Sequence, residues 1–195
     1  MNNRNGRVDC DTYNIPVYPY DGDKPIFNIW MLDSAWYDKK NDKCHEAVKP
    51  ETVEWYKAES AKLREQNGGE PVPSLMFLHI PLPEILNLLE PCGENDVGAV
   101  KTPQNGFCRL KESVRGKMCE YPSVLSDSAG LFDAIRECGD VRSVVSGHDH
   151  PNCFEGKYDG VEFVQTSCAS FRCYGNEMRG VRVFEIDQRD PQDVL

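Results

Sequence analysis

The sequence predicts a mixed α/β fold, and three observations support this prediction. Apolar runs at 26–34 and 73–80, rich in β-branched and aromatic residues, have the composition of buried strands. Helix signals lie between these runs and again at 127–140. Further strand-like runs follow one another late in the chain, at 141–147, 160–167 and 179–187. This order is typical of a sheet that helices cover on at least one face.

The first expected helix covers residues 49–69. Pro50 suits the first helical position, and Gly68 can adopt the left-handed conformation that ends many helices. The apolar periodicity predicts an inward-facing stripe on this helix, made of Val53, Tyr56, Ser60 and Leu63.

The middle of the chain is less regular. Residues 82–90 can make a short helix, whereas 91–126 combine Gly, Pro, Asn and charges without sustained periodicity. We expect this second segment to be a long surface excursion, since ordinary loops rarely exceed about 12–15 residues.

The second expected helix covers residues 127–140. Ser126 or Asp127 can cap its first turn, and Gly139 can end it. Its apolar residues are expected to face the core, and they are Leu131, Phe132, Ile135 and Cys138. The alternating runs at 160–167 and 179–187 are compatible with a hairpin or a meander.

The length and charge restrict the classes of function. A chain of 195 residues is expected to form a single domain over 1–195, or part of one. With 22 Lys and Arg against 32 Asp and Glu, the net charge is −10, which disfavours nucleic acid and anionic membranes as partners. The most apolar region is interrupted by His79, Pro81 and Pro83, so no membrane-spanning helix is predicted.

The N-terminus and the cysteines bear on the compartment. The first ten residues lack the apolar segment of a secretory signal, which favours a cytoplasmic location unless the N-terminus is truncated. The nine cysteines are odd in number and include no C-x-x-C pair. Reduced, mostly buried thiols are therefore favoured over a secreted, disulfide-bonded protein, which stays the alternative.

A pair of histidines follows the run at 141–147. In an extended segment His148 and His150 would point the same way and Asp149 the opposite way, while Gly147 permits a sharp turn. Imidazole is a common ligand of zinc, iron and manganese, so the spacing indicates a metal site. The alternative is a polar loop whose histidines bind carbonyl groups and water.

The remaining histidines differ in their positions. His79 ends the run at 73–80, where parallel strands of an α/β sheet open into a ligand crevice, although a core histidine bonded to a carbonyl is the alternative. His45 is expected to be a loop residue outside the site. Asp149 and Asn152 can orient the metal ligands through hydrogen bonds without binding the metal themselves, or can simply be polar turn residues.

Four segments of the sequence resemble one enzyme family. They are FLHIPLPE, SGHDHPN, IWMLDS and GVRVFEID, and the resemblance extends from about residue 13 to residue 187. The chain resembles the calcineurin-like metallophosphoesterases, in particular the purple acid phosphatase-like branch. The resemblance implies a four-layer α/β/β/α sandwich with mixed sheets. It also implies that His79 and His148 bind one metal ion and His150 a second, the metals being Fe, Mn or Zn.

The other motifs of that family, D-x-H, G-D-x-x-D and G-N-H, do not occur in the sequence. Two dications about 3.5–4 Å apart repel each other, and three neutral imidazoles supply no negative charge to offset this. We therefore expect one ion or none in this chain alone. The chain resembles the C-terminal half of the family fold, which would expose an apolar sheet face. We therefore expect a missing N-terminal segment, a partner chain, or poor solubility of the chain alone.

Two functions follow from the sequence. The leading one is a metal-dependent phosphoesterase, or its C-terminal segment, in which a metal-bridging hydroxide attacks a small phosphate ester. The alternative is a non-catalytic remnant or a phosphatase-like binding module. A nuclease, the third class considered, is disfavoured by the net charge of −10.

Overall fold

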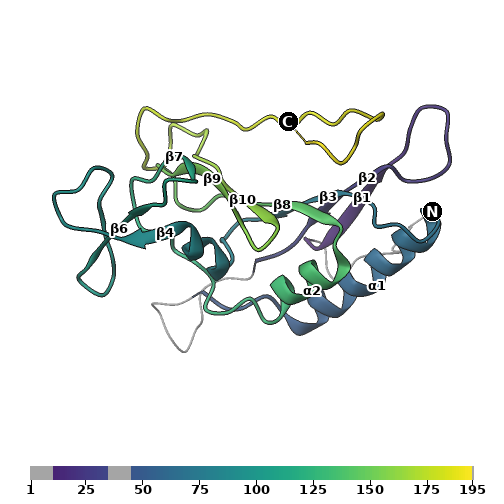
Figure 1. Ribbon diagram of the computed structural model, residues 1–195, viewed down its shortest axis with the longest axis horizontal. Helices are drawn as coiled ribbons and strands as arrows, with labels where there is room; N and C mark the ends of the chain where they lie inside the picture. The colour runs from purple at the N-terminus through teal and green to yellow at the C-terminus, as the bar shows by residue number, and fades with distance from the viewer. Residues whose placement is uncertain (1–10, 35–44, 195) are drawn as a thin grey trace.

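The computed structural model describes residues 11–34 and 45–194, and its centre is a mixed seven-stranded sheet (Figure 1). Its strands, in spatial order, are β1 (Tyr13–Val17), β2 (Phe27–Met31), β3 (Ser74–Leu78), β8 (Val141–Ser146), β10 (Val161–Gln165), β9 (Cys153–Tyr158) and β7 (Arg115–Lys117). The mixed α/β class predicted from the sequence is thereby confirmed.

The four central strands run parallel, and this aligns the ends that carry the histidines. β2 pairs with β3, β3 with β8 and β8 with β10, whereas β1, β9 and β7 are antiparallel to their neighbours. Leu78 lies opposite Ser146 in the ladder between β3 and β8. The residues that follow these two strands, His79 and Gly147, therefore meet at the same edge of the sheet.

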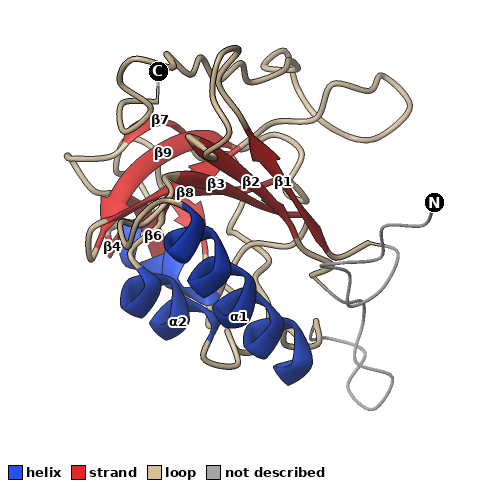
Figure 2. Cartoon of the chain, turned by 90° about the vertical axis from the view of Figure 1, so that its right-hand side faces the viewer, coloured by secondary structure: helices blue, strands red, loops and turns tan. Residues whose placement is uncertain are grey.

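Two helices cover one face of the sheet (Figure 2). They are α1 (Pro50–Gln66) and α2 (Leu131–Cys138). The expected inward stripe of α1 is buried, and Gly68 and Gly139 adopt positive φ after the two helices. The predicted cap of α2 was wrong, because the N-cap is Gly130 and the Asp127 carboxylate instead accepts a hydrogen bond from the Ala129 amide.

A buried polar network fastens α1 to the sheet. The Tyr56 and Ser60 hydroxyls of α1 both donate to the carboxylate of Asp140, which precedes β8. Trp30 of β2 donates its indole N–H to the Ser74 hydroxyl of β3 over 3.0 Å. These bonds satisfy polar groups that would otherwise destabilise the core.

The C-terminal segment covers the opposite face (Figure 1). Phe184 and Ile186 pack against the buried apolar residues of this face, namely Phe27, Leu75, Val145 and Val164. The strand and hairpin expected at 179–187 were wrong, because the segment holds only an isolated bridge between Ile186 and Val194. Burial alternates along the segment all the same: Val181, Val183 and Glu185 are exposed, whereas Arg182, Phe184 and Ile186 are half-buried.

The chain between the two histidine strands contains short elements. A 3-10 helix at Pro83–Leu88 occupies the expected helical position, and the strands β4 (Leu89–Pro91), β5 (Val100–Lys101) and β6 (Phe107–Leu110) form a second sheet at one end of the molecule (Figure 1). The segment 91–126 also supplies β7 to the main sheet.

The burial of the cysteines differs from the expectation. The described part of the chain contains seven free cysteines, of which only Cys108 is buried, whereas mostly buried thiols were expected. Cys10 and Cys44 lie outside the described residues. No helix among residues 11–34 and 45–194 is long and apolar enough to cross a membrane.

Candidate metal centre

Three histidines meet at the carboxyl ends of β3 and β8. His148 Nδ1 lies 3.3 Å from Nε2 of His79. The ring of His45 packs edge-on against that of His148 with centroids 4.7 Å apart, and its Nε2 lies 3.2 Å from the Ser123 hydroxyl. The structure therefore adds His45 to the site, where the sequence indicated an ordinary loop residue.

The separation of the first two nitrogens suits a single metal ion. Two imidazole nitrogens bound to one tetrahedral ion at about 2.0–2.1 Å lie about 3.3 Å apart. The nitrogens of His79 and His148 already have this separation, with the rings inclined by 84°. This separation suits two ligands of one ion, and it is also that of a hydrogen bond between the two rings.

The electrostatics of the cluster keep its imidazoles neutral. The pKa of His148 is lowered to about 4. The main cause is burial, and the charges of the neighbouring His45, His79 and His150 add to it. The pKa values of His45 and His79 are also lowered, in each case chiefly by burial. Neutral imidazoles are the form that binds metals, because their ring nitrogen then offers a lone pair.

The histidine pair sits in a tight turn instead of the expected extended segment. His148 has φ of 74°, the Gly147 amide donates to the His79 carbonyl, and the Asp149 amide donates to the Gly147 carbonyl. As a result His148 faces His79 and His45, while His150 turns toward Tyr174. The structure thus brings His79 and His148 into contact, and places His150 against different neighbours.

Asp149 and Asn152 bind the backbone of the neighbouring segment 119–123. Asp149 accepts a hydrogen bond from the Ser123 amide, and Asn152 accepts from the Cys119 and Glu120 amides and donates to the Glu120 carbonyl. Burial raises the pKa of Asp149 to about 7, although the Ser123 amide opposes this shift. The hydrogen bonds of both side chains hold this segment against the histidine turn.

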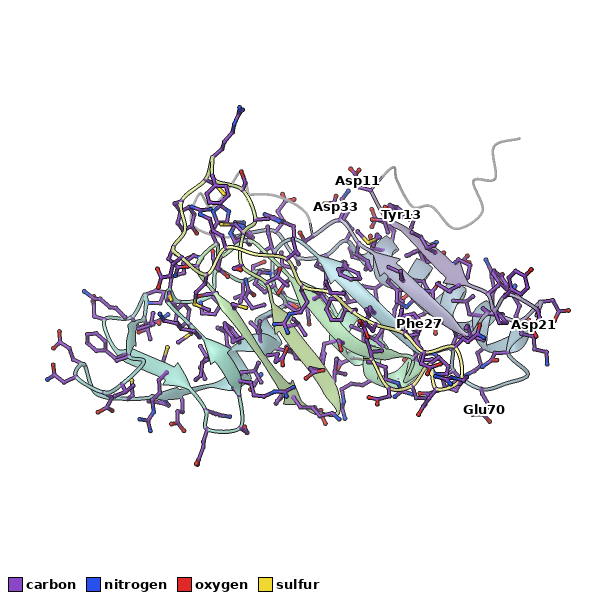
Figure 3. All side chains as sticks on the ribbon, turned by 90° about the horizontal axis from the view of Figure 1, so that it is seen from above. Asp11, Tyr13, Asp21, Phe27, Asp33 and Glu70 are labelled. Atoms are coloured by element: carbon purple, nitrogen blue, oxygen red, sulfur yellow. The ribbon has the colours of Figure 1, made fainter. Side chains whose placement is uncertain are left out.

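Carboxylates lie near the edge but outside the histidine group. Asp33 follows β2 on the same edge, and Figure 3 shows it close to Asp11. Among residues 11–34 and 45–194, the one set of at least three His, Cys, Asp or Glu side chains with ligand atoms within 4.8 Å of one another is His150, Cys168 and Cys173. Among the described residues this set contains no carboxylate.

Tyr174 determines the position of His150. The two rings stack with centroids 4.2 Å apart, and His150 Nδ1 lies 2.9 Å from the Tyr174 carbonyl oxygen. The Tyr174 hydroxyl donates to Glu120 over 2.7 Å, and burial, followed by this bond, raises the pKa of Tyr174 to about 12. Sequence reasoning missed the cysteines beside His150, because their C-x₄-C spacing is not a usual metal motif.

A cavity of about 640 Å³ opens beside His79. Its walls are mainly apolar and come from β3, β8 and the C-terminal segment, with Phe77, Val145 and Phe184 among the lining residues. Arg182 also reaches this cavity, and its guanidinium group is paired with Glu155. Ligand sites commonly combine apolar walls with a few polar groups in this way.

No protein-family model matches the chain. The chain is 27% identical over 173 residues to probable inactive purple acid phosphatase 29 of Arabidopsis thaliana, covering 84% of this chain and 39% of that protein. The chain resembles the purple acid phosphatases over most of its length.

Two further purple acid phosphatases of Arabidopsis thaliana are similar to the chain. Probable inactive purple acid phosphatase 14 is 28% identical over 174 residues, covering 83% of this chain and 38% of the relative. Probable inactive purple acid phosphatase 28 is 24% identical over 180 residues, covering 89% and 40%. The chain thus spans about two fifths of the length of these purple acid phosphatase relatives, and all three names include the word inactive.

Proposed function

We propose that this chain is the histidine-bearing segment of a metal-dependent phosphoesterase of the calcineurin-like class. The observation that carries the proposal is the 3.3 Å separation of the His79 and His148 nitrogens, which suits two ligands of one ion. His150 is the proposed ligand of a second ion in a complete enzyme. The proposed fold of that enzyme is a four-layer sandwich, of which this chain supplies a mixed sheet and its two helices.

The residues of the chain would prepare the site in three ways. Burial keeps His79 and His148 neutral, so that their nitrogens can bind Fe, Mn or Zn. Asp149 and Asn152 fix the turn that presents His148, through their bonds to residues 119–123. A bound metal supplies Lewis acidity, which polarises a phosphoryl oxygen and lowers the pKa of a bound water. A small phosphate ester is the proposed substrate class.

A second candidate function is a non-catalytic phosphatase-like module. It is favoured by the names of the three relatives, which include the word inactive, and by the direction of His150, which packs on Tyr174. Among the described residues, the one set of at least three close ligand atoms contains no carboxylate. Such a module would bind one metal ion through His79 and His148 without hydrolysing an ester.

The test is elemental analysis of the 195-residue chain after loading with Mn²⁺ or Fe²⁺, ions for which imidazole and oxygen ligands suffice. We expect about one ion per chain, lost in His79→Ala and in His148→Ala. Asp133→Asn, at an exposed position of α2 outside the histidine cluster, is the control and should keep the ion. No bound ion in the wild-type chain, or binding that survives both alanine variants, would contradict the proposed site.

The two candidate functions differ in hydrolysis. The metal-loaded chain is incubated with an aryl phosphate, beside the His148→Ala variant. Hydrolysis that the variant loses supports the phosphoesterase, whereas metal binding without hydrolysis supports the non-catalytic module.

A further inference from the structure

His150 and two cysteines form a second group of metal-ligating side chains. One ring nitrogen of His150 and the sulfur atoms of Cys168 and Cys173 all lie within 4.8 Å of one another, and all three residues are half-buried. We propose that these three residues bind a single thiophilic metal ion such as Zn²⁺, with the fourth position open to solvent. Two thiolates and one imidazole are a ligand set that suits zinc, with three protein ligands and one exchangeable position.

The backbone already ties the three ligands together. The Cys168 amide donates to the His150 carbonyl over 3.0 Å, so these two residues are held side by side although 18 positions separate them. The Gly180 amide donates to the Cys168 carbonyl over 3.3 Å. Only four residues lie between Cys168 and Cys173. The short loop between them turns back, so the two sulfur atoms lie close together. Little rearrangement is then needed to shorten the separations to those of a coordinated ion.

The hydrogen bond of His150 determines which ring nitrogen carries the lone pair. A carbonyl oxygen can only accept, so Nδ1 must carry the proton in its 2.9 Å bond to the Tyr174 carbonyl. The unprotonated nitrogen of the neutral ring is then Nε2. Metal-binding histidines commonly donate their other ring N–H to a carbonyl or carboxylate, which fixes the tautomer and orients the ring. Stacking on Tyr174 adds to this orientation.

Arg179 supplies positive charge and shapes the loop that bears the cysteines. Its Nη1 lies 2.8 Å from Cys168 Sγ, and its Nη2 donates to the Cys173 carbonyl over 2.8 Å. The same guanidinium group binds the Ser170 carbonyl. Burial and the neighbouring Cys173 raise the pKa of the Cys168 thiol, and the positive charge of Arg179 opposes this rise.

Gly175 leaves the space that this arrangement needs. A Cβ at position 175 would lie 2.9 Å from Cys168 Sγ and 3.0 Å from the Arg179 guanidinium carbon. Any side chain there would displace the sulfur or the cation. The loop therefore has a glycine where the Cys168 sulfur and the Arg179 guanidinium group pack against its backbone.

This proposal is independent of the proposed phosphoesterase. His79 and His148 contribute no atom to the cysteine group, and no hydrolysis is implied. The two proposals share His150 only, so a metal ion at the cysteines would withdraw this histidine from a second phosphoesterase ion.

The experiment is a Co²⁺ titration of the full 195-residue chain under anaerobic, reducing conditions. Thiolate ligation gives an intense sulfur-to-cobalt charge-transfer absorption in the near ultraviolet, which imidazole alone does not give. We expect this band to saturate at one equivalent. Affinity should fall more than about 100-fold in Cys168→Ser and in Cys173→Ser, since removing even an outer-shell partner commonly costs about 10–100-fold.

Two control experiments test whether the band arises from Cys168 and Cys173. Cys92→Ser replaces another half-buried cysteine and should leave the band unchanged, which excludes a general effect of thiol loss. The double variant His79→Ala, His148→Ala should keep the band while it loses the proposed phosphoesterase ion. The proposal is overturned if the reduced wild-type chain gives no charge-transfer band, or if the band persists in both Cys168→Ser and Cys173→Ser.

Discussion

Asp140 is a carboxylate enclosed in the core, where it is 2% exposed. Burial raises its pKa, while the hydrogen bonds from Tyr56 and Ser60 of α1 oppose the shift. Burial also raises the pKa values of Tyr56 and of Cys138, which lies at the end of α2 beside this network.

The raised pKa of Asp140 predicts a pH-dependent stability. The folded protein binds the Asp140 proton more tightly than the unfolded chain does, so this contribution is complete below about pH 3.9 and is lost as pH rises through the folded pKa. We expect the free energy of unfolding of the wild type, measured relative to Asp140→Asn, to fall between pH 4 and pH 8. Urea unfolding at several pH values measures this difference, with Asp133→Asn at an exposed position of α2 as the control. A difference that stays constant with pH would contradict the expectation.

At the scale of single residues, the sequence predicted those site residues that directly follow regular strands. His79 and the 148–150 turn follow β3 and β8, whose apolar runs are plain, so their meeting at one edge could be anticipated. His45, Cys168 and Cys173 lie in irregular segments, where no periodic pattern predicts which way a side chain points. Their approach to His148 and His150 depends on tertiary contacts that no local pattern encodes.

Among the elements, the junction of β7 with β9 depends on a glycine. Gly116 has φ of 109°, and a Cβ there would lie 2.2 Å from the Cys153 carbonyl oxygen. Gly98 has φ of 78° with nothing within 4 Å of its Cβ position. An alanine at position 98 therefore tests the cost of backbone strain alone, without crowding.

The glycine comparison gives a prediction for β7. Gly98→Ala should cost about 1–2 kcal/mol, the strain of a left-handed residue. Gly116→Ala should cost about 1–3 kcal/mol more, because crowding of the neighbouring strand is added. Urea unfolding of both variants measures the difference, and amide hydrogen exchange should show faster exchange in β7 for Gly116→Ala. Equal stabilities of the two variants would show that β7 accommodates the side chain.

The sequence revealed the helices better than the short strands. α1 and α2 have apolar stripes and terminal glycines, whereas β5 and β7 have two and three residues, too few for a periodicity to appear. The β9–β10 hairpin turns at Asp159 and Gly160, which both have positive φ, and this Asp-Gly pair was a usable signal that was overlooked. At 179–187 exposed and half-buried residues do alternate. The alternation arises because one side of the segment packs on the sheet, although the segment pairs with no neighbouring strand.

For the whole molecule, the C-terminal segment is the only described cover of the second sheet face. Phe184 packs edge-on against Phe77 of β3 with centroids 6.1 Å apart. Val183, the preceding residue, is 69% exposed.

This cover predicts unequal effects for neighbouring substitutions. Phe184→Ala should lower the free energy of unfolding by about 1–3 kcal/mol, since a half-buried ring loses part of its apolar burial. Val183→Ala should change it by less than about 0.5 kcal/mol, as is usual at exposed positions. Urea unfolding measures both, and binding of a hydrophobic dye should rise only for Phe184→Ala. Equal effects of the two substitutions would mean that the segment does not pack on the sheet in solution.

The overall class and the helix-covered face of the molecule could be predicted, because they follow from the order of strong periodic segments. The second sheet and the C-terminal cover could not, since both depend on pairing and packing between segments that carry weak local signals. The four-layer arrangement stays a prediction.

The two outer strands of the main sheet have a consequence for the behaviour of the protein at high concentration. β1 contains Pro16, which has no amide hydrogen to offer another strand, and β7 has three residues with a positive charge at each end. Short, charged or proline-containing edge strands discourage the addition of strands from other molecules. Both outer strands of the sheet thereby disfavour growth into aggregates.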